Sequence, residues 1–97
     1  MQVPPPAPGP ALITVVESDG CHYCADAVDA LARLAAAFPL RVRTVDALSE
    51  PGRELMRRHR AAMSPLVLLD DTFFSSGRLP RRKLEKALAA RYGQRHG

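Results

Sequence analysis

Cysteine is scarce in this chain of 97 residues, which contains only two, Cys21 and Cys24. A small secreted domain held together by disulfides normally carries more cysteines at wider spacings. A bond between residues three positions apart closes a very small loop and restricts the unfolded chain only slightly. The pair is therefore poorly suited to stabilising a fold, and its spacing favours a reactive centre.

Long hydrophobic runs are also missing. The longest near the N-terminus covers residues 11–16, well short of the roughly 18–20 apolar residues needed to span a bilayer. No basic segment precedes it, and a secretory signal needs both a charged start and a longer apolar stretch. We therefore expect a soluble cytoplasmic protein with no membrane partner.

The remaining composition is that of one globular domain without internal repeats. A hydrophobic fraction of 46% is typical of a chain that buries a core, and 97 residues suffice for one core. The net charge of +4 and the pI of about 9.7 allow weak attraction to nucleic acid or acidic partners but establish neither.

Proline is concentrated at the N-terminus, where residues 1–10 hold five of the nine prolines. Such a segment cannot bury enough apolar surface to order itself, so we expect a disordered leader there. We place the folded domain at residues 11–92 and a short C-terminal tail at residues 93–97.

The first half of the domain predicts a strand, a helix and a second strand. Residues 11–16 form a β-prone run without alternation, as expected of a strand buried on both faces. After a turn at residues 17–20, apolar side chains recur at helical spacing until Pro39. The expected inner face of this helix consists of Val28, Leu31, Leu34, Ala35 and Phe38. Residues 40–45 alternate in part, which fits a half-exposed edge strand.

A second helix follows, and Ser64-Pro65 interrupts the chain after it. Ser49 suits the N-cap position of this helix, with Pro51 in its first turn. Its expected inner face consists of Leu55, Met56, His59 and Met63.

The last third of the chain predicts a hairpin and a final helix. An apolar strand at residues 66–69, a turn at residues 70–71 and a returning strand at residues 72–75 form the hairpin. The helix follows Pro80 and ends at Gly93. Its expected inner stripe consists of Leu84, Ala87, Leu88 and Tyr92.

The element order β-α-β-α-β-β-α predicts an α/β fold. Two strands joined by a helix run parallel with a right-handed crossover, and the last two strands pair as a hairpin. The result is a four-stranded mixed sheet with helices on both faces.

The chemistry lies in Cys21-His22-Tyr23-Cys24, which opens the first helix. At the start of a helix, unpaired backbone N–H groups and the helix dipole favour an anion such as the Cys21 thiolate. The dipole contributes about 0.3–1 kcal/mol at an exposed site and up to about 2 kcal/mol in good geometry. One pKa unit is about 1.4 kcal/mol, so the dipole can lower a thiol pKa by about one unit from its ordinary 8.5. A larger shift requires direct N–H···S hydrogen bonds or a protonated His22.

A CxxC pair that opens the first helix after the first strand, with a proline just before the third strand, resembles the thioredoxin fold. The short helices and the Cys-x-Tyr-Cys core resemble glutaredoxins and related small redoxins over residues 11–92. The resemblance implies a dithiol–disulfide oxidoreductase that reduces protein or mixed disulfides. It also implies that Cys21 is the nucleophile and that Cys24, one helical turn later, resolves the mixed disulfide.

The same resemblance gives roles to neighbouring residues. Tyr23 shapes the substrate surface. Pro65 corresponds to a cis-proline that faces the CxxC pair and exposes the backbone of Ser64 to an extended substrate segment. His22 stands where many glutaredoxins have proline, and it either tunes the pKa of Cys21 or is a solvated helix residue.

Three departures from glutathione-using glutaredoxins concern the electron donor. No lysine precedes Cys21 closely, Met63-Ser64-Pro65 replaces Thr-Val-Pro, and residues 75–78 lack a Gly-Gly pair followed by an acidic residue. Glutathione is therefore one candidate donor, beside mycothiol and a thioredoxin-reductase-like enzyme. We expect disulfide-containing protein substrates, no tightly bound cofactor and a monomer.

Two other functions stay open. An iron–sulfur cluster carrier would hold its cluster with Cys21 of two chains and an external thiol. A non-catalytic basic binding module would use the arginines of residues 53–60, although the chain has no motif that reads a nucleic-acid groove and we expect no nucleic-acid partner. Structural zinc needs four ligands, and without a second CxxC pair we expect no metal.

Overall fold

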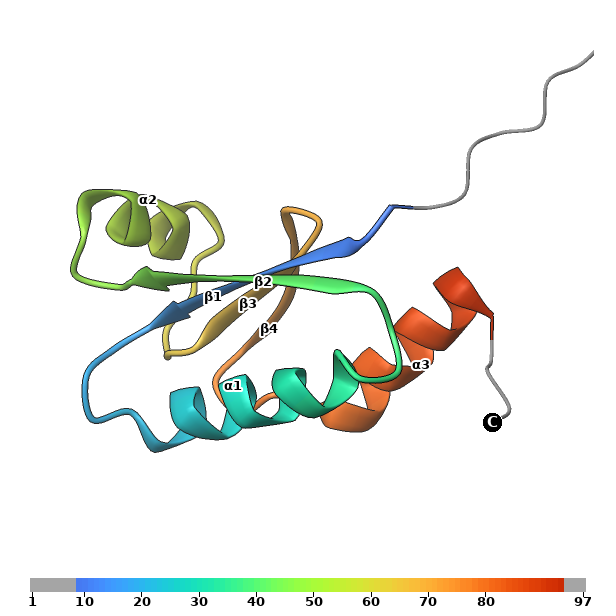
Figure 1. Cartoon of the computed structure of the whole chain (residues 1–97). Helices are drawn as coiled ribbons and strands as arrows, with labels where there is room; N and C mark the ends of the chain where they lie inside the picture. Colours follow the sequence, from blue (N-terminus) through green and yellow to red (C-terminus); the bar gives the residue numbers. More distant parts are fainter. Residues whose placement is uncertain (1–8, 94–97) are drawn as a thin grey trace, which may run out of the picture.

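The computed structural model describes residues 9–93, which form one four-stranded mixed sheet covered by three helices (Figure 1). The strands are β1 (Ala11–Glu17), β2 (Leu40–Asp46), β3 (Leu66–Leu69) and β4 (Thr72–Ser76). The helices are α1 (His22–Leu34), α2 (Glu50–Arg58) and α3 (Arg81–Tyr92). This order confirms the predicted fold class. The leader expected at residues 1–10 and the tail expected at residues 93–97 lie largely outside the described residues.

The sheet has the strand order β2-β1-β3-β4. β1 runs parallel to β2 and antiparallel to β3, and β3 and β4 form a hairpin. α1 and α3 lie on one face of the sheet and α2 on the other (Figure 1). The two central strands are therefore covered on both sides, and β2 is an edge strand as predicted.

Two hydrophobic clusters fill the space between the sheet and the helices. The larger one, on the side of α1 and α3, comprises Ala11, Ile13, Val15, Ala27, Ala30, Leu31, Phe38, Val67, Leu79, Leu84 and Leu88. The smaller one, on the side of α2, comprises Val16, Leu66 and Leu68. β1 supplies Ile13 and Val15 to one cluster and Val16 to the other, which explains its apolar run without alternation.

The predicted inner face of the first helix is wrong in part. The residues that α1 buries are Cys24, Ala27, Ala30 and Leu31. Val28 is 37% exposed, because it lies about 80° around the helix axis from the midpoint of Ala27 and Leu31. The helix ends before Ala35, which is an exposed C-cap, and a turn then carries Phe38 into the core.

The prediction that Met63 shares the inner face of the second helix is also wrong. α2 ends at Arg58, Arg60 adopts a left-handed φ of 50°, and Met63 follows in the loop with 53% exposure. Leu55 and Met56 do pack against the smaller cluster. A helix of nine residues ends too early to carry its periodicity to Met63.

The chain turns where the sequence contains turn and cap residues. Asp70 and Asp71 have φ values of 50° and 65°, as a two-residue hairpin turn requires. The Ser49 hydroxyl caps α2 by accepting a hydrogen bond from the Gly52 N–H at 3.1 Å. Gly93, with a φ of 78°, ends α3.

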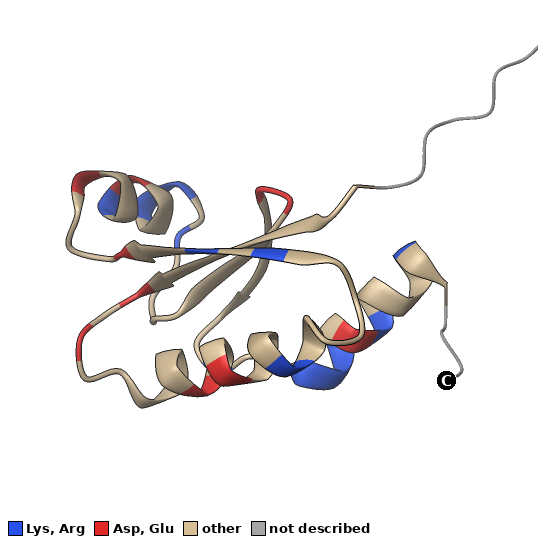
Figure 2. Ribbon diagram, viewed as in Figure 1, with Lys and Arg blue, Asp and Glu red and all other residues tan. Residues whose placement is uncertain are grey.

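Charged residues are distributed unevenly along the described part of the chain (Figure 2). Lysine and arginine gather on α2 and around the start of α3, where Arg78, Arg81, Arg82 and Lys83 line an open hollow. Arg81 pairs with Asp26 and so joins α3 to α1. The connection between β1 and α1 carries Asp19 and no cation, so the basic surfaces lie on other elements.

Candidate redox site

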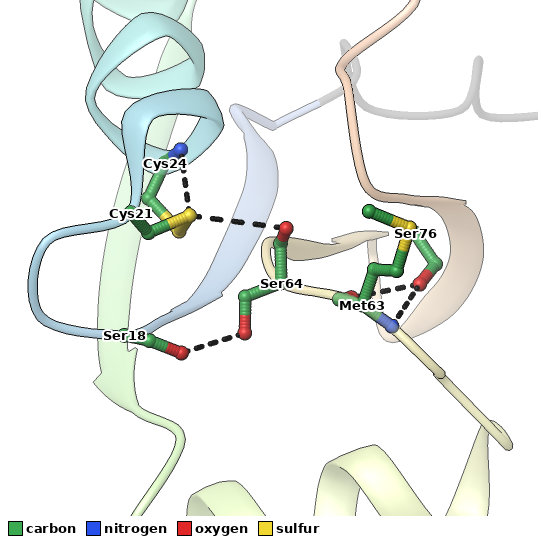
Figure 3. The surroundings of a disulfide bond; sticks show 6 residues. All are labelled: Ser18, Cys21, Cys24, Met63, Ser64 and Ser76. Carbon is green, nitrogen blue, oxygen red and sulfur yellow. Dashed lines mark hydrogen bonds between the residues drawn. A yellow bond between two sulfur atoms is a disulfide. The ribbon is translucent and has the colours of Figure 1, made fainter.

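Cys21 and Cys24 form a disulfide at the point where the chain leaves β1 and enters α1 (Figure 3). Their Cα atoms lie 5.2 Å apart. Cys21 is the N-cap of α1, with an extended backbone (φ −82°, ψ 111°), and Cys24 lies in the first helical turn. The site is thus built on the junction of the central strand and a helix.

The two cysteines differ in exposure. Cys24 is buried, with 3% of its surface accessible, and belongs to the inner face of α1. Cys21 is partly exposed on the rim of an open hollow that Glu17, Asp19 and His22 also line. An incoming thiol or disulfide therefore reaches the sulfur of Cys21 first.

The sulfur of Cys21 occupies the acceptor position of a helix cap. The backbone N–H of Cys24 donates a hydrogen bond to the Cys21 Sγ at 3.1 Å. The turn before the helix is closed by a bond from the Cys21 N–H to the Ser18 carbonyl oxygen at 3.3 Å. The left-handed φ of 68° at Gly20 brings the chain into this turn. A thiolate on Cys21 would keep this N–H partner and gain from the helix dipole.

A loop from the other side of the sheet faces the disulfide. The Ser64–Pro65 peptide bond is cis, and Pro65 is fully buried just before β3. The Ser64 carbonyl oxygen lies 3.8 Å from the Cys21 Sγ (Figure 3). The structure thus brings Cys21, Cys24, Ser64 and Pro65 together, from segments about 40 residues apart in the chain.

His22 and Tyr23 occupy the outer side of the first helical turn. Both are exposed, Tyr23 by 41%, and their ring centroids lie 6.2 Å apart. Within residues 9–93 neither ring makes a hydrogen bond to a cysteine sulfur. Tyr23 is therefore available on the surface beside the disulfide, and a tuning role for His22 stays a prediction.

Sequence reasoning missed two serines that hold the cis-proline loop. The hydroxyls of Ser18 and Ser64 lie 2.8 Å apart and share a hydrogen bond. The Ser76 hydroxyl donates to the Met63 carbonyl oxygen at 2.8 Å and accepts from the Met63 N–H at 3.4 Å. Serine is common in turns, so nothing in the sequence distinguished these two from other turn residues.

Within residues 9–93 no three histidine, cysteine or carboxylate side chains are grouped so that they could hold a metal ion. In the same part of the chain no helix has the length and apolar character to cross a bilayer.

Comparison with known proteins yields similar structures but no similar sequences. No family model and no curated protein sequence matches the chain. A thioredoxin-like protein from Clostridium perfringens is 16% identical, with a TM-score of 0.68 over 92% of this chain and 80% of that one. Mitochondrial thioredoxin 3 from Saccharomyces cerevisiae, in its oxidised form, is 17% identical, with a TM-score of 0.62 over 87% and 81%. Thioredoxin f2 from Chlamydomonas reinhardtii is 13% identical, with a TM-score of 0.60 over 89% and 83%.

Proposed function

Because the chain has the thioredoxin fold and bonds a partly exposed cysteine to a buried one at the start of α1, we propose that it is a thiol–disulfide oxidoreductase. The observation that carries this proposal is the unequal placement of the two sulfur atoms. Cys21 is accessible and capped by an N–H group, whereas Cys24 is buried one turn away. This arrangement suits an attacking thiol and a resolving thiol better than a structural bond.

The proposed reaction moves two electrons from the protein to a substrate disulfide. The Cys21 thiolate attacks one substrate sulfur, the substrate S–S bond breaks, and the other substrate sulfur leaves as a thiolate that takes up a proton. Cys24 then loses its proton and attacks the Cys21 sulfur, which releases the first substrate sulfur. The substrate ends as a dithiol and the protein as the Cys21–Cys24 disulfide, the form that the structure contains.

A reductant must reopen this disulfide before the next cycle. We propose that the donor is either a low-molecular-weight thiol, glutathione or mycothiol, as in a glutaredoxin-like cycle, or else a thioredoxin-reductase-like enzyme. The substrates are then protein disulfides or mixed disulfides in the cytoplasm, where such donors keep most thiols reduced. Tyr23 and Ser64 form the substrate surface in this proposal, since both adjoin Cys21 in sequence or in space, and the buried Pro65 contributes to substrate binding through the cis peptide bond that orients Ser64.

Alkylation of the reduced protein tests the proposal directly. The rate of reaction of Cys21 with iodoacetamide, measured against pH, should rise at a pH below the ordinary cysteine pKa of about 8.5, because the thiolate is the reacting form. Insulin reduction with dithiothreitol as donor should be accelerated by the same preparation. An ordinary thiol pKa together with no insulin reduction would contradict the proposed function.

A second assay identifies the donor. NADPH oxidation is followed with insulin as substrate in three separate mixtures, containing thioredoxin reductase, glutathione with its reductase, or mycothiol with its reductase. The mixture that supports turnover names the donor class. Turnover with thioredoxin reductase alone would exclude the glutaredoxin-like cycle and leave the oxidoreductase proposal intact.

A further inference from the structure

We propose that Ser76 and Ser18 are positioning residues that fix the register in which a substrate segment pairs with Ser64. This inference rests on the proposed oxidoreductase function and deepens it. The hydroxyl groups of these two residues hold the loop that contains the cis peptide bond. Both lie outside the disulfide itself, Ser18 in the connection after β1 and Ser76 at the end of β4 (Figure 3).

The hydroxyl of Ser76 forms hydrogen bonds with both the N–H and the C=O group of Met63. Ser76 is the last residue of β4, and its Oγ donates to the Met63 carbonyl oxygen and accepts from the Met63 N–H. The Met63 side chain lies over Gly77, whose position would place an added Cβ 3.6 Å from the Met63 Sδ. Met63 is therefore held against the end of β4 by both its backbone and its side chain.

This bonding leaves one residue of the loop able to pair with an extended substrate. An added strand needs free N–H and C=O groups on the protein. The Met63 N–H is bonded to Ser76 and its carbonyl oxygen already accepts one hydrogen bond, whereas Pro65 has no N–H and its carbonyl oxygen accepts from the Gly77 N–H at 3.0 Å. Among the hydrogen bonds of residues 9–93, none engages the Ser64 N–H. A substrate strand is thus restricted to Ser64, because after a shift by one residue it meets no free N–H group.

Ser18 fixes this pairing residue relative to the reactive sulfur. Its hydroxyl bonds to the Ser64 hydroxyl, and its carbonyl oxygen accepts the Cys21 N–H. One residue therefore contacts both the loop that receives the substrate and the loop that carries the nucleophile. The Ser64 carbonyl oxygen stays 3.8 Å from the Cys21 sulfur, so a strand paired with Ser64 presents its own disulfide beside Cys21.

Replacement of Ser76 separates positioning from general stability. Ser76→Ala should raise the KM for insulin about five- to tenfold, the effect of losing one hydrogen-bonding group. The rate with 5,5′-dithiobis(2-nitrobenzoic acid), measured in a single turnover of the pre-reduced protein, should change less than twofold because this small disulfide needs no strand pairing. Ser76→Thr keeps the hydroxyl and should restore most of the insulin KM.

The neighbouring serine provides a matched control. Ser75 lies on the same strand, but its Oγ is buried without a hydrogen-bond partner among the described residues. Ser75→Ala should leave both substrates unaffected. Hydrogen exchange gives a readout independent of activity, since Ser76→Ala should accelerate exchange of the Met63 amide and Ser75→Ala should not.

The second hydroxyl pair is tested by a double-mutant cycle. Ser18→Ala and Ser64→Ala should each lower kcat/KM for insulin about threefold to tenfold, and the double variant should be no worse than either single variant. If the losses of the two single variants multiply in the double variant, the Ser18 and Ser64 hydroxyls act independently, and the inference fails.

An unchanged insulin KM in Ser76→Ala, or an equal loss on both substrates, would overturn the positioning role. If the unmodified protein reduces no disulfide, the proposed function fails as well, whereas unaffected variants of an active protein overturn only this inference.

Discussion

At the scale of single residues, the proposed chemistry depends most on the sulfur atom of Cys21. It takes the acceptor position that a serine or aspartate oxygen usually occupies at a helix N-cap. Hydrogen bonds to an ionised acceptor are stronger than those to a neutral one. The contact from the Cys24 N–H therefore both starts α1 and favours the thiolate that the proposed reaction needs.

Replacing each cysteine in turn should separate their roles. Cys24→Ser should trap a lasting mixed disulfide between Cys21 and a substrate, because no second sulfur is present to displace the substrate. Cys21→Ser should trap nothing and should lower insulin reduction to the uncatalysed rate, since the buried Cys24 is inaccessible. Intact-mass measurement under non-reducing conditions detects the trapped species.

Full dithiol turnover by Cys24→Ser would show that the resolving role is wrong. Trapping by Cys21→Ser in place of Cys24→Ser would instead reverse the two roles. The double variant lacks both sulfurs and serves as the background for both measurements.

At the scale of elements, the position of α2 on the sheet depends on a close approach between the backbones of β2 and α2. Gly52 lies in the first turn of α2 and is buried. An added Cβ there would lie 1.9 Å from the Asp46 carbonyl oxygen and 2.8 Å from its carbonyl carbon. The end of β2 and the start of α2 can meet in this way only if the residue has no side chain.

Gly52→Ala should therefore destabilise the protein by about 2–3 kcal/mol, because backbone atoms must move to admit the methyl group. Helix propensity alone would favour alanine by about 1 kcal/mol, so the predicted sign runs against propensity. Urea unfolding followed by circular dichroism measures the difference. Arg58→Ala, on an exposed position of the same helix, should stay within about 0.5 kcal/mol of the unmodified protein. A Gly52→Ala variant as stable as that control would refute the close approach.

Much of the molecule as a whole could be predicted from local sequence signals. Four such signals are the unalternating run of β1, the Ser49 cap, the turn at residues 70–71 and the stop at Gly93, and each acts on the chain close to its own position. These signals sufficed for the element order, the edge position of β2 and the placement of the CxxC pair at a helix start. The loop at Pro65 was placed opposite that pair by family resemblance, and the structure brings the two together.

Features that depend on tertiary contact could not be predicted in the same way. Periodicity allowed Val28 as a core residue, but the sheet contacts the helix through Ala27 and Leu31. It also extended the second helix to Met63, although the left-handed Arg60 ends that pattern earlier. The serine contacts at the site join residues 46 and 13 positions apart, and no local pattern encodes them.

Asp70 joins three parts of the molecule and makes its stability depend on pH. It follows β3, its Oδ1 accepts the Leu12 N–H at 2.9 Å, and its Oδ2 pairs with Arg91 of α3. The Leu12 N–H lowers the pKa of the Asp70 carboxyl below its ordinary 3.8, and the bond from Arg91 acts in the same direction against the opposing effect of burial. A pKa lowered by folding stabilises the folded state above the unfolded value, and this contribution is lost as the pH falls through the folded value.

Asp70→Asn keeps an oxygen for the Leu12 N–H and a residue that tolerates the left-handed turn, but it removes the titrating charge. The loss of stability between pH 7 and pH 2.5 should therefore be smaller in the variant, by about 1 kcal/mol or less because the pair is partly exposed to solvent, which screens it. Urea unfolding at the two pH values measures this difference. Equal pH dependence in the variant and the unmodified protein would mean that the bonds of Asp70 do not favour its ionised form, and that the junction of β1, the hairpin and α3 is held by packing alone.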